Sequence, residues 1–260
     1  MIPGMTKLLA ATGSIGGGSS AEVVNLDDSK PNLICDNLPN LSVSLYGSVG
    51  TLFRGTPIIC GGISDKIDNR CYSSDKGAWK PILSMNASRY APGTITFSQT
   101  SSEKDEIFLV SAGTSSDGQT QSTVESFDGM SWNQTKFAHL PVPIMGNCMV
   151  KFNNSVMMSI GGSKLHNAAN STAETNFFYV SQNKWVSGPL LAIPRMHHAC
   201  GIMNWNNPAT GSLEKVVVVA GITIFKCFKY YKYYKYYKYY KYYKYYKYCN
   251  YYKYYKPYKY

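Results

Sequence analysis

Short apolar runs that each end in glycine recur along this sequence. They occupy residues 7–13, 57–62, 107–113, 156–162 and 216–221, and strand-favouring residues dominate them. The glycines that close the later runs, Gly62, Gly113, Gly162 and Gly221, lie 51, 49 and 59 residues apart. This period predicts repeated structural units, each with a buried strand that ends at a glycine.

An aromatic residue and then a tryptophan follow three of these runs. The pairs are Tyr72 and Trp79, Phe127 and Trp132, and Tyr179 and Trp185, with turn-forming residues between them. One further strand-like segment precedes each of the later runs; these segments are 45–53, 91–97, 147–152 and 198–205. The pattern predicts four strands per unit, with the aromatic and the tryptophan filling the space between neighbouring sheets.

The joint recurrence of glycine pair, aromatic and tryptophan resembles the kelch repeat. The resemblance covers about residues 7–222. Two units depart from it by reading Ala-Gly (112–113 and 220–221), and the first unit has no tryptophan. The resemblance implies an all-β fold, a kelch-type β-propeller whose blades are four-stranded antiparallel sheets.

The units do not fill a whole number of blades. We expect strands two to four of a first blade (7–37), three full blades (45–86, 90–137 and 146–188) and two strands of a fifth (198–205 and 215–221). About four blades are therefore present, and we expect an incomplete ring, a fragment of a larger propeller. In the alternative, 198–205 joins the N-terminal strands and closes four blades, which leaves 216–221 surplus. We expect 216–222 to be prone to aggregation as an exposed strand edge.

The basic charge of the chain is confined to its C-terminal tail. The chain has 26 Lys and Arg against 15 Asp and Glu, a net charge of +11, but residues 229–260 contain ten of the Lys and none of the acidic groups. Residues 1–228, the predicted propeller domain, carry a net charge of only +1, which argues against a nucleic-acid partner for this part.

The tail itself, 229–260, is an almost uninterrupted Lys-Tyr-Tyr repeat. A period of three matches neither a strand nor a helix, so we expect a disordered, low-complexity segment. One explanation is a translated simple DNA repeat. The alternative is a real segment that binds polyanions through lysine and stacked tyrosine.

Signals for the cellular compartment are weak. The longest apolar run, 216–225, is too short to span a membrane, and the apolar stretch 8–11 is too short for a signal peptide. The seven Cys form no C-x-x-C pair, which argues against a zinc ribbon and leaves disulfides open. N-x-S/T sequons at Asn40, Asn86, Asn133, Asn153 and Asn170 slightly favour an extracellular over a cytoplasmic protein.

Residues for catalysis are sparse. The four His form no metal-ligand spacing, and adjacent His197 and His198 would point to opposite faces of a strand, so we expect no metal or other cofactor. Cys148 and Cys200 occupy matching repeat positions, typical of small inward residues, with a catalytic Cys–His pair as a disfavoured alternative. A galactose-oxidase-like or sialidase-like enzyme is also disfavoured. The segment 73–79 only weakly resembles the Asp-box of sialidases, and the arginines available for their arginine cluster are Arg54, Arg70, Arg89 and Arg195.

The loops of the blades are the remaining candidates for function. The kelch resemblance implies a partner-binding rim formed by the segments that lead into first strands and by the second-to-third loops. Arg89 and Tyr90, then Arg195, Met196 and His197, match the lead-in position, where Arg could bind a carboxylate bidentately. Alternatively, each Arg caps a strand or pairs within the blades. The loops 64–68, 114–122 and 163–174 are polar and variable in length.

We therefore expect a non-enzymatic scaffold that binds a protein or peptide partner. The alternatives are a propeller enzyme acting on carbohydrate, or a ubiquitin-ligase substrate adaptor if a further N-terminal domain exists.

Overall fold

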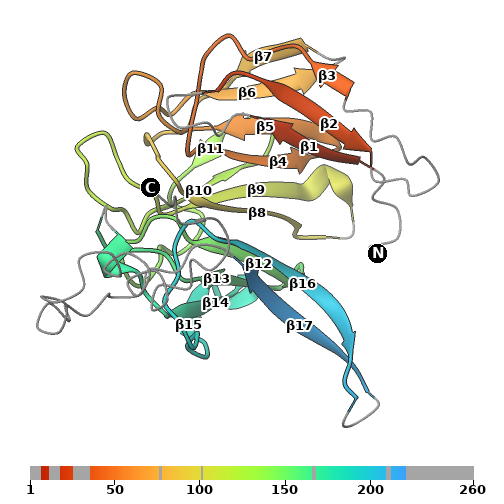
Figure 1. The fold of residues 1–260 in the computed structure, drawn as a ribbon, viewed down its shortest axis with the longest axis vertical. Helices are drawn as coiled ribbons and strands as arrows, with labels where there is room; N and C mark the ends of the chain where they lie inside the picture. Colours follow the sequence, from red (N-terminus) through yellow and green to blue (C-terminus); the bar gives the residue numbers. More distant parts are fainter. Residues whose placement is uncertain are drawn as a thin grey trace, which may run out of the picture. The chain divides into compact units, whose positions relative to one another are not determined.

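In the described part of the computed structural model, the regular secondary structure is almost all β-strand (Figure 1). The structure describes residues 7–11, 18–25, 36–75, 78–100, 102–165, 168–208 and 212–220. The chain divides into two compact units, Met1–Ile222 and Thr223–Tyr260. The second unit, and with it the expected Lys-Tyr-Tyr tail, lies outside the described residues.

Five antiparallel sheets follow one another along the first unit, and within each sheet the strands run in chain order. Three of the sheets have four strands, the N-terminal sheet has three, and the last has two. The strands of the five sheets are β1 (Lys7–Ala11), β2 (Ala21–Asn25) and β3 (Asp36–Leu38); β4 (Val49–Phe53), β5 (Thr56–Cys60), β6 (Cys71–Asp75) and β7 (Ala78–Ile82); β8 (Gly93–Ser98), β9 (Glu106–Ser111), β10 (Val124–Phe127) and β11 (Trp132–Asn133); β12 (Cys148–Asn153), β13 (Val156–Ile160), β14 (Thr175–Tyr179) and β15 (Lys184–Ser187); and β16 (Ala199–Asn206) and β17 (Leu213–Ala220). Short 3-10 helices occupy Glu103–Asp105, Ala168–Asn170 and Val180–Gln182.

This order of strands confirms the prediction of an all-β propeller with about four blades. The first strands of successive sheets lie against each other, β4 with β8, β8 with β12, and β12 with β16. Within the described ranges β1 pairs with β2 and β16 pairs with β17, so β16 is not joined to the N-terminal sheet as the four-bladed alternative required. No helix in these ranges is long and apolar enough to cross a membrane.

Tryptophans connect neighbouring sheets. The Trp132 ring stacks on Phe127 at 5.1 Å between centroids, and the Trp185 ring lies 4.8 Å from Phe178. Each indole N–H also reaches the preceding sheet, where Trp132 Nε1 donates to Leu83 O (2.9 Å) and Trp185 Nε1 to Ala138 O (2.8 Å). Each indole thus fills space between two sheets and keeps its donor satisfied.

The predicted aromatic partner was wrong in one blade. Trp185 faces Phe178 across the strand pair, whereas Tyr179 faces Lys184. Phe178 is fully buried and Tyr179 is half-buried. Adjacent residues of a strand point to opposite faces of the sheet. Choosing Tyr179 instead of Phe178, one position away, therefore placed the predicted aromatic residue on the wrong face.

The glycine pairs make the close contacts expected of them. Gly62 and Gly162 have φ of +94° and +109°, and a Cβ on either would lie 2.9 Å from a backbone oxygen, of Tyr46 or Met145. Gly62 N donates to Arg89 O and Gly162 N to Arg195 O, both at 2.7 Å. The second glycine of each pair therefore binds the chain that leads into the next sheet. Ala112 occupies the first position of its pair with φ of 64°.

Two disulfides between described cysteines hold strands together. Cys60–Cys71 crosses β5 and β6 within one sheet, and Cys148–Cys200 joins β12 to β16, the first strands of successive sheets. The matching repeat positions of Cys148 and Cys200 thus reflect a covalent bond between two sheets. A bonded sulfur is no nucleophile, which removes the catalytic Cys–His alternative.

Candidate functional site

The segments that lead into first strands and the second-to-third loops lie at the same end of the sheets. Each loop is closed by a bridge, Ile63 to Ile67, Thr114 to Thr120, or Ser163 to Ser171. The residue that opens each loop also bridges to the lead-in segment of its own sheet, in the pairs Tyr46–Ile63, Tyr90–Thr114 and Met145–Ser163. We call this end the loop face; it comprises lead-in segments 45–48, 89–92, 144–147 and 195–198 and loops 63–67, 114–120, 163–165 and 168–171.

A line of backbone hydrogen bonds crosses the loop face from sheet to sheet. Ala91 N donates to Gly47 O (2.8 Å), Gly146 N to Ala91 O (2.7 Å) and His197 N to Gly146 O (2.8 Å). These four residues occupy equivalent positions, and all have positive φ, between 48° and 64°. The line sets four lead-in segments side by side, and it needs a backbone conformation that favours glycine.

His197 carries the largest side chain in this line, because two of the equivalent positions are glycine and the third is Ala91, whereas the His197 imidazole is exposed. Its φ is 48°, in the left-handed region that costs an ordinary residue about 1 kcal/mol or more. Strain of this kind at an exposed position is typical of functional sites.

Three rings form a row along the same line. The Tyr46 and Tyr90 centroids are 5.3 Å apart with their planes near perpendicular, and the Tyr90 and His197 centroids are 6.1 Å apart. A Cβ on Gly47 would collide with the Tyr90 ring, so glycine is what allows the tyrosine to lie over the backbone. Burial, and then the nearby Tyr46, raise the pKa of Tyr90 above its ordinary value. We call Tyr46, Tyr90 and His197 the aromatic row.

Met196, predicted to lie on the rim, is buried instead. Its side chain is 7% exposed and packs with Ala91 and Met145, against Tyr90. Met196 and Met145 therefore support the aromatic row from within, which corrects the expectation that Met196 offers itself to a partner.

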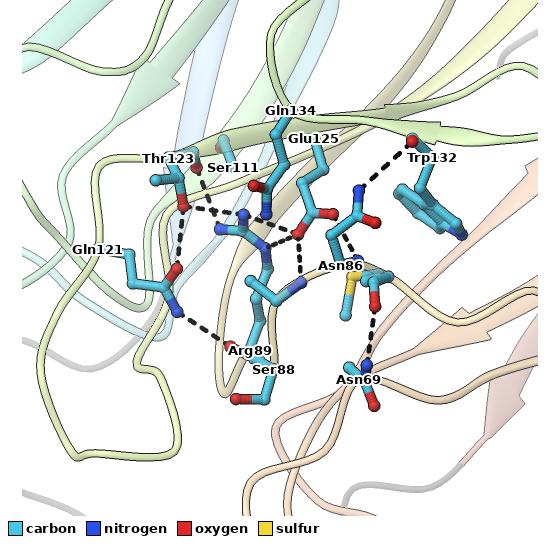
Figure 2. Close-up of polar contacts among 12 residues, drawn as sticks. Asn69, Asn86, Ser88, Arg89, Ser111, Gln121, Thr123, Glu125, Trp132 and Gln134 are labelled. Atoms are coloured by element: carbon cyan, nitrogen blue, oxygen red, sulfur yellow. Dashed lines mark hydrogen bonds and ion pairs between the residues drawn. The ribbon is translucent and has the colours of Figure 1, made fainter.

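Arg89 is also removed from the rim, because its side chain is fully buried. Its guanidinium contacts Glu125 Oε1 through Nη2 (2.9 Å) and Nε (3.0 Å) (Figure 2). The remaining donors reach Ala112 O, Thr123 O and Thr123 Oγ1. Burial lowers the pKa of Arg89, and the Glu125 carboxylate opposes that shift.

The carboxylate of Glu125 is equally engaged. It accepts the backbone N–H groups of Asn86 (2.7 Å) and Ala87 (3.1 Å) in addition to Arg89. The expectation that Arg89 binds a partner's carboxylate is thus wrong, and the alternative of pairing within the blades describes its side chain. Sequence reasoning missed Glu125, although an acidic residue inside a strand of otherwise apolar and small residues, Val124–Phe127, signals a buried counter-charge.

Arg195 stands at the position equivalent to Arg89 and is half-buried. Its carbonyl oxygen accepts Gly162 N, and its own N–H donates to Thr172 O (3.2 Å). Its side chain belongs to the lead-in segment of β16, whose sheet has two described strands. Whether Tyr90, Arg195 and His197 bind a partner stays a prediction.

The loops around the aromatic row carry exposed polar side chains of both signs, Asp65, Lys66, Asp117, Gln119 and Lys164. Hydrogen bonds tie neighbouring loops together, from Thr120 Oγ1 to Lys164 O (2.9 Å) and from Ser116 N to Ser88 Oγ (3.0 Å). The loop face is therefore a supported polar surface around a central aromatic row.

His198 lies next to this row but points inward. It is 8% exposed, and neither ring nitrogen has a hydrogen-bond partner in the described structure. Burial first, and then the charges of Arg195 and His197, lower its pKa to about 4, so it is neutral at physiological pH. Among the described residues no group of three or more His, Cys, Asp or Glu could hold a metal ion.

Comparison with known proteins supports the fold. No family model matches the sequence, and no curated protein matches it. Among solved structures, the chain is similar to the β-propeller YjhT, with a TM-score of 0.63 over 76% of this chain and 67% of that one, at 12% sequence identity. The sheets and this likeness define the class as a β-propeller; at such low identity the likeness carries nothing about activity.

Proposed function

We propose that this protein is a kelch-type propeller that binds a protein or peptide partner through its loop face and catalyses no reaction. The observation that carries the proposal is His197, an exposed ring held in a left-handed conformation beside Tyr90. A glycine would satisfy the backbone line at lower cost, so the ring is the feature that needs an explanation.

The kelch assignment is supported by the contacts that the motif residues make. The glycine pairs bind the lead-in chain of the next sheet, and Trp132 and Trp185 bond to the preceding sheet. These contacts support the kelch assignment because they give the glycine pairs and these two tryptophans a structural role at equivalent positions.

Tyrosine and histidine suit a recognition surface. They provide rigid apolar area with a polar edge, and aromatic rings dominate the binding energy of many protein interfaces. Ordered polar loops around a central aromatic anchor match the usual arrangement of core and rim.

A carbohydrate-processing propeller is the competing function. A sialidase-like enzyme would use an arginine cluster against an acidic sugar, but here Arg89 is enclosed by Glu125 and Arg70 is paired with Asp68. Arg54 bonds to Lys104 O and Asp128 O among the strand turns, away from the loop face. The separate engagement of these three arginines favours binding over catalysis.

The test is a selection of random phage-displayed peptides on the full chain, followed by affinity measurement on variants. Peptides that bind the loop face should bind at least about tenfold more weakly, a loss of about 1.4 kcal/mol, when His197→Gly or Tyr90→Leu is introduced. His197→Gly is informative because it removes the ring and keeps a residue that readily adopts the positive φ of the backbone line. Met130→Ala is the matched control, since Met130 is 82% exposed on a turn at the other end of the sheets.

Two results would count against the proposal. One is a set of peptides that bind the wild type, His197→Gly and Tyr90→Leu equally. The other is reproducible hydrolysis of a fluorogenic sialoside, or oxidation of galactose, by the purified chain.

A further inference from the structure

Five N-x-S/T sequons are present, and the structure distinguishes three of them, at Asn86, Asn133 and Asn153. N-linked glycosylation requires an asparagine whose amide nitrogen can carry a large polar group out into solvent. The relevant observations are therefore the exposure of each side chain and the atoms that its amide already contacts.

Asn153 ends β12 at the turn into β13, and its side chain is exposed. Its Oδ1 accepts the backbone N–H groups of Ser155 and Val156, both at 2.8 Å. Because the turn holds the oxygen, the amide nitrogen is directed away from the backbone. Among the described contacts this nitrogen donates to no acceptor.

Asn133 ends β11 and is equally exposed. Its Oδ1 accepts Thr135 N (2.8 Å), Thr135 Oγ1 (3.1 Å) and Lys136 N (2.8 Å). The sequon hydroxyl therefore already contacts the amide of the asparagine it serves. Again, the described contacts show no acceptor for the amide nitrogen.

Asn86 has the same sequon in a different environment. Its Nδ2 donates to Trp132 O (3.3 Å), and its backbone N–H donates to the buried Glu125 carboxylate (2.7 Å). Ser88 of this sequon accepts Ser116 N on its hydroxyl and Gln121 Nε2 on its carbonyl. Although the Asn86 side chain is itself exposed, a glycan on its Nδ2 would displace the hydrogen bond to Trp132 O (Figure 2).

We infer that Asn133 and Asn153 are acceptor sites for N-linked glycans and that Asn86 is not. In the transfer, Nδ2 forms a bond to the anomeric carbon of a lipid pyrophosphate-linked oligosaccharide. The bond from that carbon to the pyrophosphate oxygen breaks, the lipid pyrophosphate leaves, and Nδ2 loses one proton.

The two disulfides are consistent with a chain that passes through a compartment where N-glycans are added. Cys60–Cys71 and Cys148–Cys200 form and persist in oxidising compartments, which include the secretory pathway where N-glycans are added. This observation is independent of the sequons.

Both sites lie away from the loop face. Consecutive strands are antiparallel, so first-to-second and third-to-fourth turns lie at the end of a sheet opposite to its second-to-third loop. Asn153 stands at a first-to-second turn, and Asn133 is the second residue of a fourth strand, just after its turn. Glycans at these positions leave the aromatic row open to a partner.

The test expresses the full chain in cultured eukaryotic cells behind an appended signal sequence. Peptide N-glycosidase in heavy-oxygen water then converts each glycosylated asparagine to a mass-labelled aspartate, which peptide mass spectrometry locates. We expect label at positions 133 and 153 and none at position 86 of the secreted protein. Asn133→Gln, Thr135→Ala, Asn153→Gln and Ser155→Ala should each remove one glycan, and Thr135→Ser should retain it.

Absence of label at position 133 or 153 in secreted protein with both disulfides intact overturns the assignment of that site. Label at position 86 in that protein would show that an existing hydrogen bond of the asparagine amide does not prevent glycosylation, which overturns the criterion used to separate the sites. The retained cellular chain is digested in parallel, so that poor secretion still leaves a readout at positions 133 and 153.

Discussion

Arg89 and Glu125 form an ion pair with no exposed side-chain surface, and Arg89 Nη2 lies 2.9 Å from Glu125 Oε1. The pair joins the segment that leads into β8 to the third strand of the same sheet. It is therefore part of the framework that positions Tyr90, the next residue along the chain.

Arg89→Met should lower the free energy of unfolding by about 3–5 kcal/mol, because it leaves a buried carboxylate without its counter-charge. Urea denaturation followed by tryptophan fluorescence measures this loss. Arg195→Met is the matched control at the equivalent, half-buried position, where we expect a loss of about 1 kcal/mol or less. Equal losses in the two variants would show that the Arg89 pair has no special structural role.

Gly62→Ala should be strongly destabilising, by more than about 2 kcal/mol, because it adds two costs. Its φ is +94°, and the new Cβ would lie 2.9 Å from Tyr46 O and Ser48 N, which are backbone atoms. Gly118→Ala is the control, since Gly118 has φ of +80° and a Cβ added there would have no atom within 4 Å. We expect about 1 kcal/mol there, from conformation alone. Thermal unfolding of both variants separates the cost of the positive φ from the cost of the close Cβ contact. Similar losses of stability in the two variants would contradict the proposed role of the glycine pair.

The stability of the propeller should fall between pH 6.5 and pH 4 because of His198. Its folded pKa is about 4, below the ordinary value of 6.5, so in this window the unfolded chain binds more protons than the folded one. One pKa unit corresponds to about 1.4 kcal/mol, so the full difference between 6.5 and about 4 corresponds to a loss on the order of 3 kcal/mol.

His198→Leu should remove most of this dependence, and unfolding free energies measured between pH 5 and pH 7.5 would reveal it. In that window carboxylates contribute little. A slope that survives in His198→Leu would place the titrating group elsewhere.

Local patterns were sufficient to predict the strands. The glycine-ended runs and the tryptophans located three four-stranded sheets because each unit repeats the same short-range demands: alternation along a strand, a turn, and a glycine at positive φ. The segment that leads into each first strand was also predicted, and with it the positions of Tyr90 and His197.

The roles of individual side chains depended on residues far along the chain. Arg89 was expected on the surface, but its side chain is buried in an ion pair with Glu125, 36 positions later. Cys148 pairs with Cys200, 52 residues away, because β12 and β16 are the first strands of adjacent sheets. Burial and pairing are properties of the space between sheets. The repeat in the sequence determined that such sheets exist, and only the tertiary structure decided which side chains meet between them.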